Sequence, residues 1–128
     1  MTRKIIQTNN APAAIGPYSQ ANAAGGFLFT AGQIPLDAST MEVVGSNAAE
    51  QAQKALENAK AVVEAGGMTL DNVIKATIFI LDMNEFGNIN EVYSTFFAEN
   101  PPARSVVEVS RLPKDVLVEI EMIAYSDE

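Results

Sequence analysis

Short segments of β-branched and aromatic residues, separated by glycine and proline, predict five strands along the chain. The clearest is the nearly continuous apolar run NVIKATIFIL, which is typical of a strand covered on both faces. Ala23-Ala24-Gly25-Gly26 separates the first two segments and indicates a hairpin. The predicted strands span residues 18–22, 27–31, 72–81, 104–110 and 116–125.

Two longer segments have the apolar spacing of helices. The first runs from a capping Ser46 to residue 65 and ends at Gly66-Gly67. The second spans residues 82–99, opens with a capping-box-like pair at Asp82 and Glu85, and ends before Pro101-Pro102. The apolar stripes comprise Ala52, Leu56, Ala59 and Val63 in the first helix, and Phe86, Ile89, Tyr93 and Phe96 or Phe97 in the second.

The element order ββαβαββ predicts an α+β fold with two helices on one face of a mostly antiparallel sheet. Along the last strand, one face is wholly apolar and is expected under the helices, while the other mixes apolar residues with charges. We expect Arg104 and Glu119 to point to this mixed face. Because a mixed face is typical of a subunit interface, we expect a homo-oligomer. The apolar face comprises Val118, Ile120, Met122 and Ala124, and the mixed face comprises Leu117, Glu119, Glu121, Ile123 and Tyr125.

Length and composition narrow the class of protein. The 128 residues, 48% of them apolar, fit one domain spanning 1–128. A net charge of −8 repels nucleic acid and anionic membranes, so neither is an expected partner. The absence of His and Cys excludes disulfides, iron–sulfur and zinc sites and Ser–His or Cys–His nucleophiles, and no carboxylate spacing indicates a metal site. Without a signal-peptide pattern or an apolar run near the ~20 residues of a membrane helix, we expect a cytoplasmic protein.

Arg104 and Glu119 are the strongest candidates for chemistry. Arg104 follows a Pro-Pro-Ala corner and is one of three arginines, and its guanidinium fork suits the carboxylate of a small anionic substrate. The alternative is a structural ion pair with Glu108, Glu119 or Glu121. In the middle of the last strand, Glu119 would move a proton or hold a water if partly desolvated. The alternative for Glu119 is a paired or solvated strand carboxylate.

Three further positions are candidates for lining a ligand site. Tyr18 follows a Gly-Pro turn, from which its ring would either close over a ligand or simply pack. Gly32 ends a strand and permits close approach of a ligand to backbone N–H groups, although a plain turn explains it equally. Asn90 lies among the polar positions of the second helix, where exposure to solvent is the simpler interpretation.

Several motifs occur in a fixed order over the whole chain. Each alone is weak, but the set is specific, and with it the chain resembles the Rid family of reactive-intermediate deaminases, also called the YjgF family. The motifs are APAAIGPYSQ at 11–20, GQIP at 32–35, PARS at 102–105, VEV at 107–109, RLPKD at 111–115 and VEIE at 118–121.

The resemblance implies a chorismate-mutase-like fold and a homotrimer whose three sheets form a central barrel, with sites in the clefts between subunits. It implies a small 2-imino or 2-keto acid as the partner in that cleft. The implied reaction is hydrolysis of 2-iminobutanoate or 2-iminopropanoate, formed from enamines, to 2-keto acids and ammonia. No metal or organic cofactor is implied.

The resemblance also implies roles for individual residues. Arg104 would hold the substrate carboxylate, and Glu119 would position or activate the water that attacks the imine carbon. Tyr18 and Asn90 would line the cleft from the neighbouring subunit, and Gly32 would shape its floor. Fixing the carboxylate in this way would place the C=N bond beside the water, and such orientation lowers a barrier by several kcal/mol, about 7 or more in favourable cases.

Two positions depart from the usual pattern of the family. Val106 stands where cysteine is usual, and only its main chain would contact the imine nitrogen or the water. Ala31 stands where serine is usual, which removes one hydroxyl from the cleft. Both departures favour, as an alternative, a non-catalytic sensor or regulator that binds a 2-keto acid. A ribonuclease or translation inhibitor is a further alternative, which the net charge and the lack of histidine oppose.

Overall fold

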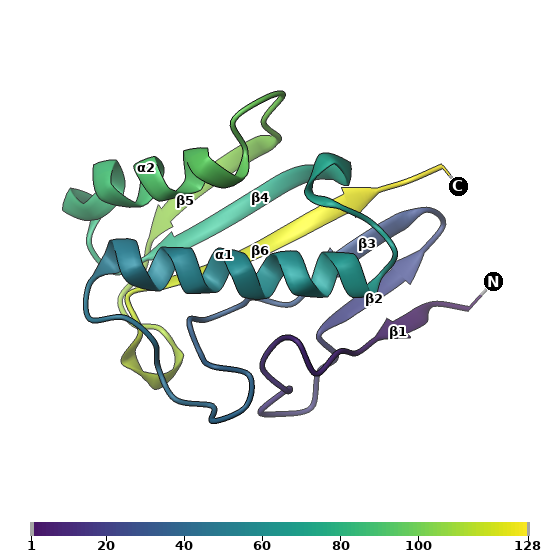
Figure 1. The fold of residues 1–128 in the computed structure, drawn as a ribbon, viewed down its shortest axis with the longest axis horizontal. Helices are drawn as coiled ribbons and strands as arrows, with labels where there is room; N and C mark the ends of the chain where they lie inside the picture. The colour runs from purple at the N-terminus through teal and green to yellow at the C-terminus, as the bar shows by residue number, and fades with distance from the viewer. Residues whose placement is uncertain (1, 128) are drawn as a thin grey trace.

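Six strands form one sheet, and both helices lie against the same face of it (Figure 1). The computed structural model describes residues 2–127, and its sheet order is β1-β2-β3-β6-β4-β5. All neighbouring strands are antiparallel except β4 and β5, which are parallel. The elements are β1 (Lys4–Ile6), β2 (Ala21–Ala24), β3 (Phe27–Thr30), α1 (Ala48–Ala65), β4 (Val73–Ile80), α2 (Phe86–Phe96), β5 (Ala103–Glu108) and β6 (Val118–Tyr125), with short 3-10 turns at Leu70–Asn72, Met83–Glu85 and Pro113–Asp115.

The predicted α+β architecture with a mostly antiparallel sheet is confirmed, but the predicted order ββαβαββ lacks β1. This strand has only three residues, which are too few to show an alternating pattern. Its place in the sheet depends on pairing with β2, with Ile6 opposite Ala21. The order is therefore βββαβαββ.

The hairpin between β2 and β3 is confirmed, with a later start than predicted. Its turn residues Gly25 and Gly26 have φ values of 57° and 87°, the positive values that the favoured two-residue hairpin turn needs. β2 begins at Ala21 and not at Tyr18. Tyr18 therefore lies in the preceding loop and not at the start of a strand.

Helix α1 packs against the sheet along its small apolar stripe. All four residues of that predicted stripe are completely buried. The predicted cap at Ser46 is wrong, because the side chain of Asn47 accepts the hydrogen bond from the Glu50 N–H, at 2.9 Å. The backbone N–H of Ser46 instead donates to the Glu50 carboxylate. The predicted end at Gly66 is confirmed.

Helix α2 is shorter than predicted at both ends. Asp82 caps the 3-10 turn Met83–Glu85 by accepting from the Asn84 N–H, and the α-helix begins only at Phe86. It ends at Phe96, three residues before the predicted end. The buried apolar positions are Ile89, Tyr93 and Phe97, whereas Phe86 is 38% exposed.

The face of the sheet away from the helices is partly uncovered in the chain. The helix side of β6 is fully buried as predicted, whereas the second face of β4 is only partly covered within the single chain, where Ile74 is 47% exposed. An aromatic cluster on this uncovered face comprises Phe27, Phe29 and Tyr125, with ring centroids 4.8 Å apart for Phe27 and Tyr125. Exposed aromatic surface of this kind is typical of an interaction site.

Candidate active site

Arg104 lies on the helix-covered side of β5, the edge strand beside α2. Its partner in the parallel pairing with β4 is Ala76, which is completely buried under the helices. Paired residues of neighbouring strands share a face, so the predicted position of Arg104 on the mixed face is wrong. The register with β4 decides the face, and the pattern of β5 alone does not reveal that register.

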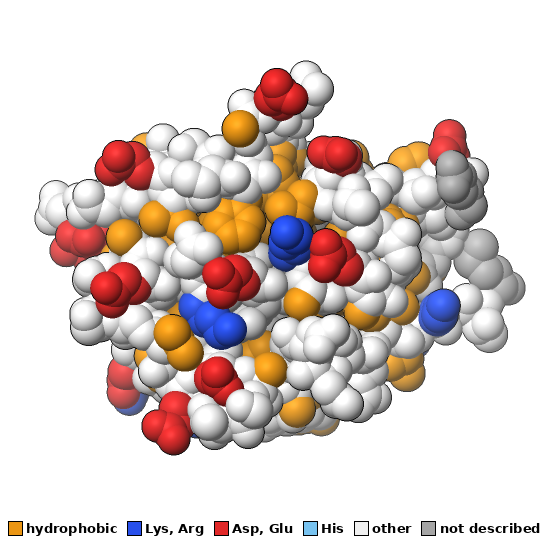
Figure 2. Space-filling model, in the orientation of Figure 1, with side chains coloured by type: hydrophobic (Ala, Val, Ile, Leu, Met, Phe, Trp, Pro, Cys, Tyr) orange, Lys and Arg blue, Asp and Glu red, His pale blue; other side chains and the backbone are white. Residues whose placement is uncertain are grey.

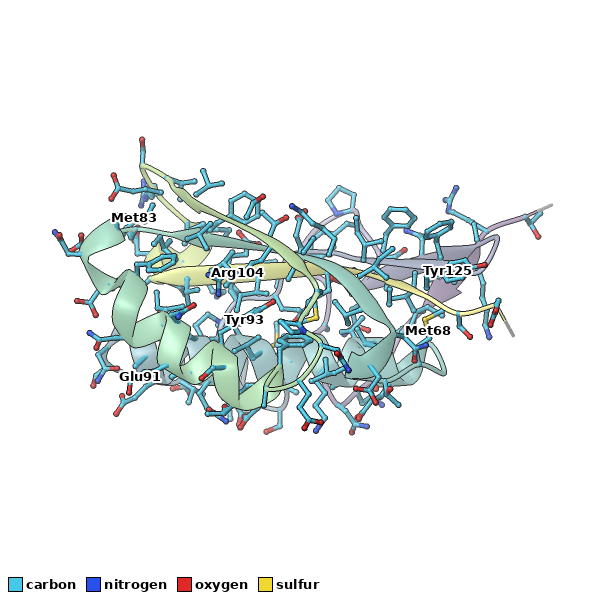
Figure 3. The ribbon with its side chains drawn as sticks, turned by 90° about the horizontal axis from the view of Figure 1, so that it is seen from above. Met68, Met83, Glu91, Tyr93, Arg104 and Tyr125 are labelled. Atoms are coloured by element: carbon cyan, nitrogen blue, oxygen red, sulfur yellow. The ribbon has the colours of Figure 1, made fainter. Side chains whose placement is uncertain are left out.

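Residues of α2 surround the Arg104 guanidinium. Asn90 Oδ1 accepts a hydrogen bond from Arg104 Nη1 at 2.7 Å. The guanidinium carbon lies 4.7 Å from the ring centroid of Tyr93 and 5.5 Å from that of Phe86, and both distances are within the range of a cation–π interaction. Figure 3 shows Arg104 and Tyr93 together between α2 and the sheet. Because Phe86, Asn90 and Tyr93 are spaced i, i+4 and i+7, they share one face of α2.

The Arg104 charge has no anionic partner among residues 2–127, where the ion pairs join Lys54 to Glu57 and Arg111 to Asp115. The predicted alternative of a structural ion pair is therefore absent. Asn90 uses one of the five guanidinium donors, and the others are available for an anion. Beside the guanidinium is a shallow hollow with mainly apolar walls, too small within the single chain to admit a water molecule, formed by Ile78, Ile80, Phe86, Ile89 and Val106. We refer to Arg104, Asn90 and these walls as the arginine half-site.

Glu119 lies on the uncovered face of the sheet, as predicted, opposite Phe79 of β4. Its side chain is half-buried, and no donor among residues 2–127 forms a hydrogen bond with its carboxylate in the structure. Burial raises the pKa of the Glu119 carboxyl above its usual value, and the charge of Glu121 raises it further. A carboxyl group with a raised pKa is suited to exchanging protons with a substrate or a water.

Gly32 lies against the Glu119 carboxylate. A Cβ atom at position 32 would lie 2.7 Å from Glu119 Cδ, so any side chain there would displace the carboxylate. The next residue, Gln33, forms two backbone hydrogen bonds with Ile120, of 2.8 and 3.0 Å, which fix this loop beside β6. We refer to Glu119 and Gly32 as the glutamate half-site.

Buried side chains and backbone contacts hold the loop of the glutamate half-site in place. Asn58 of α1 is 1% exposed, and its Nδ2 donates to the carbonyl oxygens of Ile34 and Leu36, both at 3.0 Å. On the other side, the Ala31 N–H donates to the carbonyl of Gln20 at 2.8 Å. Asn58 was not among the predicted site residues, although a polar residue on the buried face of a helix indicates such a role.

Tyr18 lies apart from both half-sites in the chain. It is 47% exposed, and its hydroxyl accepts a hydrogen bond from the Ile15 N–H at 3.2 Å. It lines a cavity of about 500 Å³ between residues 5–20 and residues 38–39. Neither Arg104 nor Glu119 lines this cavity.

The sheet separates Arg104 from Glu119 within one chain. The implied placement of Asn90 opposite Arg104, on the neighbouring subunit, is wrong for this chain, because Asn90 binds Arg104 of the same chain. Tyr93, which contacts Arg104, was predicted only as an apolar position of α2. Its signal in the sequence is an aromatic ring three residues after Asn90, on the same helix face.

Acidic side chains are scattered over the helix-covered surface (Figure 2). Among residues 2–127, they form no group of three or more that could hold a metal ion. Over the same residues, neither helix is long and apolar enough to cross a membrane.

Comparisons with known proteins find relatives that match almost the whole chain. Residues 8–126 match the family model described as Endoribonuclease L-PSP. A RutC family protein of Pyrococcus horikoshii is 56% identical over 98% of this chain and 99% of its own length. The 2-iminobutanoate/2-iminopropanoate deaminase of Escherichia coli is 51% identical over 94% of this chain and 96% of its own length. The crystal structure of E. coli TdcF with bound serine has a TM-score of 0.93 and 49% identity, covering 97% of this chain and 99% of that chain.

Proposed function

The chain belongs to the Endoribonuclease L-PSP family, which includes the RutC, Rid and YjgF proteins, and on this premise we propose that it is a deaminase of small 2-imino acids. One observation carries the proposal: Arg104 has free donors beside an apolar hollow and no ion-pair partner among residues 2–127. A guanidinium with free donors and no ion-pair partner is able to bind a carboxylate through two parallel hydrogen bonds.

In the proposed reaction, Arg104 binds the substrate carboxylate, and Glu119 accepts and donates protons. Water adds to the imine carbon while the Glu119 carboxylate accepts one of its protons and passes that proton to the imine nitrogen, which gives a neutral carbinolamine. Glu119 then accepts the proton of the carbinolamine hydroxyl as the carbonyl forms and the C–N bond breaks, and it returns this proton to the leaving nitrogen, which departs as ammonia. The raised pKa of the Glu119 carboxyl supports this exchange of acid and base roles.

The two half-sites supply one reaction only if they come from two copies of the chain. The sheet separates Arg104 from Glu119 within one copy, and the uncovered face beside Glu119 carries exposed aromatic residues. We therefore propose that the arginine half-site of one copy closes over the glutamate half-site of the next, in a homotrimer whose sheets form a central barrel. A ring of copies joined in this head-to-tail way closes without leaving an exposed half-site.

The remaining candidate residues receive roles in the same arrangement. Tyr18 lies in an exposed loop, from which it would reach the ligand of an adjacent copy. Asn90 fixes one edge of the Arg104 guanidinium, and Val106, whose main chain would contact the imine nitrogen or the water, borders the hollow. Ala31 contributes a methyl group where a hydroxyl is usual, beside Gly32 at the floor of the cleft.

The names of two relatives support this proposal. The E. coli and Salmonella typhimurium relatives named 2-iminobutanoate/2-iminopropanoate deaminase are 51% and 50% identical to this chain. The bound serine of TdcF is an α-amino acid, and it carries the same carboxylate that Arg104 would hold here. The alternative is a sensor that binds a 2-keto acid in the same cleft without turnover. The ribonuclease activity that the family description names is opposed by the net charge of −8 and the absence of histidine.

The first test uses the unmodified protein. A serine dehydratase dependent on pyridoxal phosphate releases 2-aminoacrylate, and we expect the protein to accelerate its conversion to pyruvate and ammonia in proportion to protein concentration. The measurement is pyruvate release against the same mixture without the protein. Calorimetric binding of 2-ketobutyrate without acceleration would support the sensor, and absence of both binding and acceleration would contradict the proposed site.

A further inference from the structure

Tyr93 lies against the Arg104 guanidinium through its ring and not through its hydroxyl. We propose that Tyr93 is a positioning residue, whose ring sets the orientation in which Arg104 presents its donors to the substrate carboxylate. This inference rests on the proposed function, because the carboxylate is the ligand that Arg104 would bind. Tyr93 itself does not touch the substrate in this account.

The hydroxyl group of Tyr93 plays no part in holding Arg104. It is buried and has no hydrogen-bond partner in the structure of residues 2–127. Such a group destabilises a fold, since its desolvation is not offset by a new hydrogen bond. The contact that remains is the ring face, with its centroid 4.7 Å from the guanidinium carbon.

The Tyr93 ring is held more firmly than the second ring beside Arg104. Tyr93 is 5% exposed, and its ring packs on that of Phe97 with centroids 4.8 Å apart. Phe86 is 38% exposed and its centroid lies farther from the guanidinium, at 5.5 Å. Tyr93 is therefore the fixed surface against which Arg104 rests, while the hydrogen bond to Asn90 fixes its rotation.

A neutral aromatic ring binds a cation without neutralising its charge. A carboxylate in the place of Tyr93 would neutralise Arg104 and compete with the substrate. Burial raises the pKa of the Tyr93 hydroxyl, an effect that the nearby charge of Arg104 opposes, so the phenol is neutral at neutral pH. The guanidinium thus keeps its full charge and its free donors for the incoming carboxylate.

The test distinguishes the effect of the Tyr93 ring on KM from the effect of its hydroxyl and from a general loss of stability. Tyr93→Leu removes the ring, and we expect KM for the imine to rise about tenfold with little change in kcat, because the carboxylate is held in the ground state and the transition state alike. Tyr93→Phe keeps the ring, so KM should stay within about twofold of the original value, while Tm rises because the unpartnered hydroxyl is gone. Val62→Ala, in the buried face of α1, is the matched control that lowers Tm without raising KM.

A second variant keeps the packing and changes only the ring electronics. Pentafluorophenylalanine at position 93 has nearly the same shape but a reversed ring quadrupole, so KM should again rise while Tm stays near that of Tyr93→Phe. This variant decides the question if Tyr93→Leu fails to fold. An unchanged KM in both variants, or an equal rise in KM for Val62→Ala, would overturn the proposal.

A spectroscopic readout keeps the failure of this inference distinct from failure of the proposed function. The chain has three arginines, so the Nε–H resonance of Arg104 is identified by its loss in Arg104→Lys. We expect a ring-current shift of this resonance in the original protein and in Tyr93→Phe, and a clearly smaller shift in Tyr93→Leu, in which only the more distant Phe86 ring remains. Absence of the shift in the original protein would contradict the positioning role even if imines are hydrolysed. Its presence would support that role even if they are not.

Discussion

Replacing Arg104 by alanine is expected to lower kcat/KM for imine hydrolysis by about 100- to 1000-fold, since two charge-assisted hydrogen bonds to the carboxylate are lost. Arg104→Lys should recover only part of this loss, because an ammonium group lacks the planar fork. The measurement is steady-state kinetics on enzymatically generated 2-aminoacrylate, together with calorimetric titration of 2-ketobutyrate.

The fold should survive the Arg104→Ala change. Arg104 lies on an edge strand and has no ion pair among residues 2–127, so Tm should fall by only several degrees, about what the loss of two cation–π contacts and one hydrogen bond costs. Arg3→Ala removes another arginine, an exposed one whose Nε donates to the Asn22 side chain, and should leave kcat/KM unchanged. Undiminished activity of Arg104→Ala would show that the carboxylate is held elsewhere.

Replacing Glu119 by glutamine is expected to lower kcat by about 100- to 1000-fold, the usual effect of losing a general acid–base group. Binding of 2-ketobutyrate should change little, because the carboxylate of this ligand is assigned to Arg104. Glu64→Gln, at an exposed position of α1, is the matched control and should keep full activity. A Glu119→Gln variant with normal kcat would remove Glu119 from the chemistry.

The same substitution should stabilise the fold in a pH-dependent way. The pKa of Glu119 is raised in the folded protein, so the folded state binds more protons than the unfolded state between the two pKa values. Stability therefore falls as pH rises from the ordinary value of 4.5 through the folded value, and at neutral pH the charged carboxylate destabilises the fold. The gain in Tm for Glu119→Gln should be larger at pH 7 than at pH 4. An equal gain at both pH values would mean that Glu119 is not desolvated.

The sequence predicts the elements whose pattern is local. The glycine pair of the hairpin, the alanine stripe of α1 and the alternation along β6 all carry their own signals, and each is confirmed. β1 is missed because three residues show no periodicity and depend on a partner strand. Elements with a local pattern are thus predictable from the sequence, whereas a strand such as β1, which forms only by pairing with another strand, is not.

The sequence singles out Arg104 and Glu119 by residue type, but their positions in the sheet required the structure. The residue types of Arg104 and Glu119 indicate carboxylate binding and proton transfer, but placing both on one face required the register of β5 with β4. That register brings Arg104 opposite Ala76 and under Tyr93, which no single segment reveals. The separation of the two half-sites is therefore a property of the folded chain.

The claim that one site is built from two copies is tested most directly by mixing two inactive variants. Arg104→Ala keeps the glutamate half-site, and Glu119→Gln keeps the arginine half-site. If each site joins Arg104 of one copy to Glu119 of the next, coexpressed variants that assemble at random should recover about a quarter of the original activity, since half of the copies carry each intact group. Activity in the mixed oligomer no greater than that of the two variants measured separately would contradict the account.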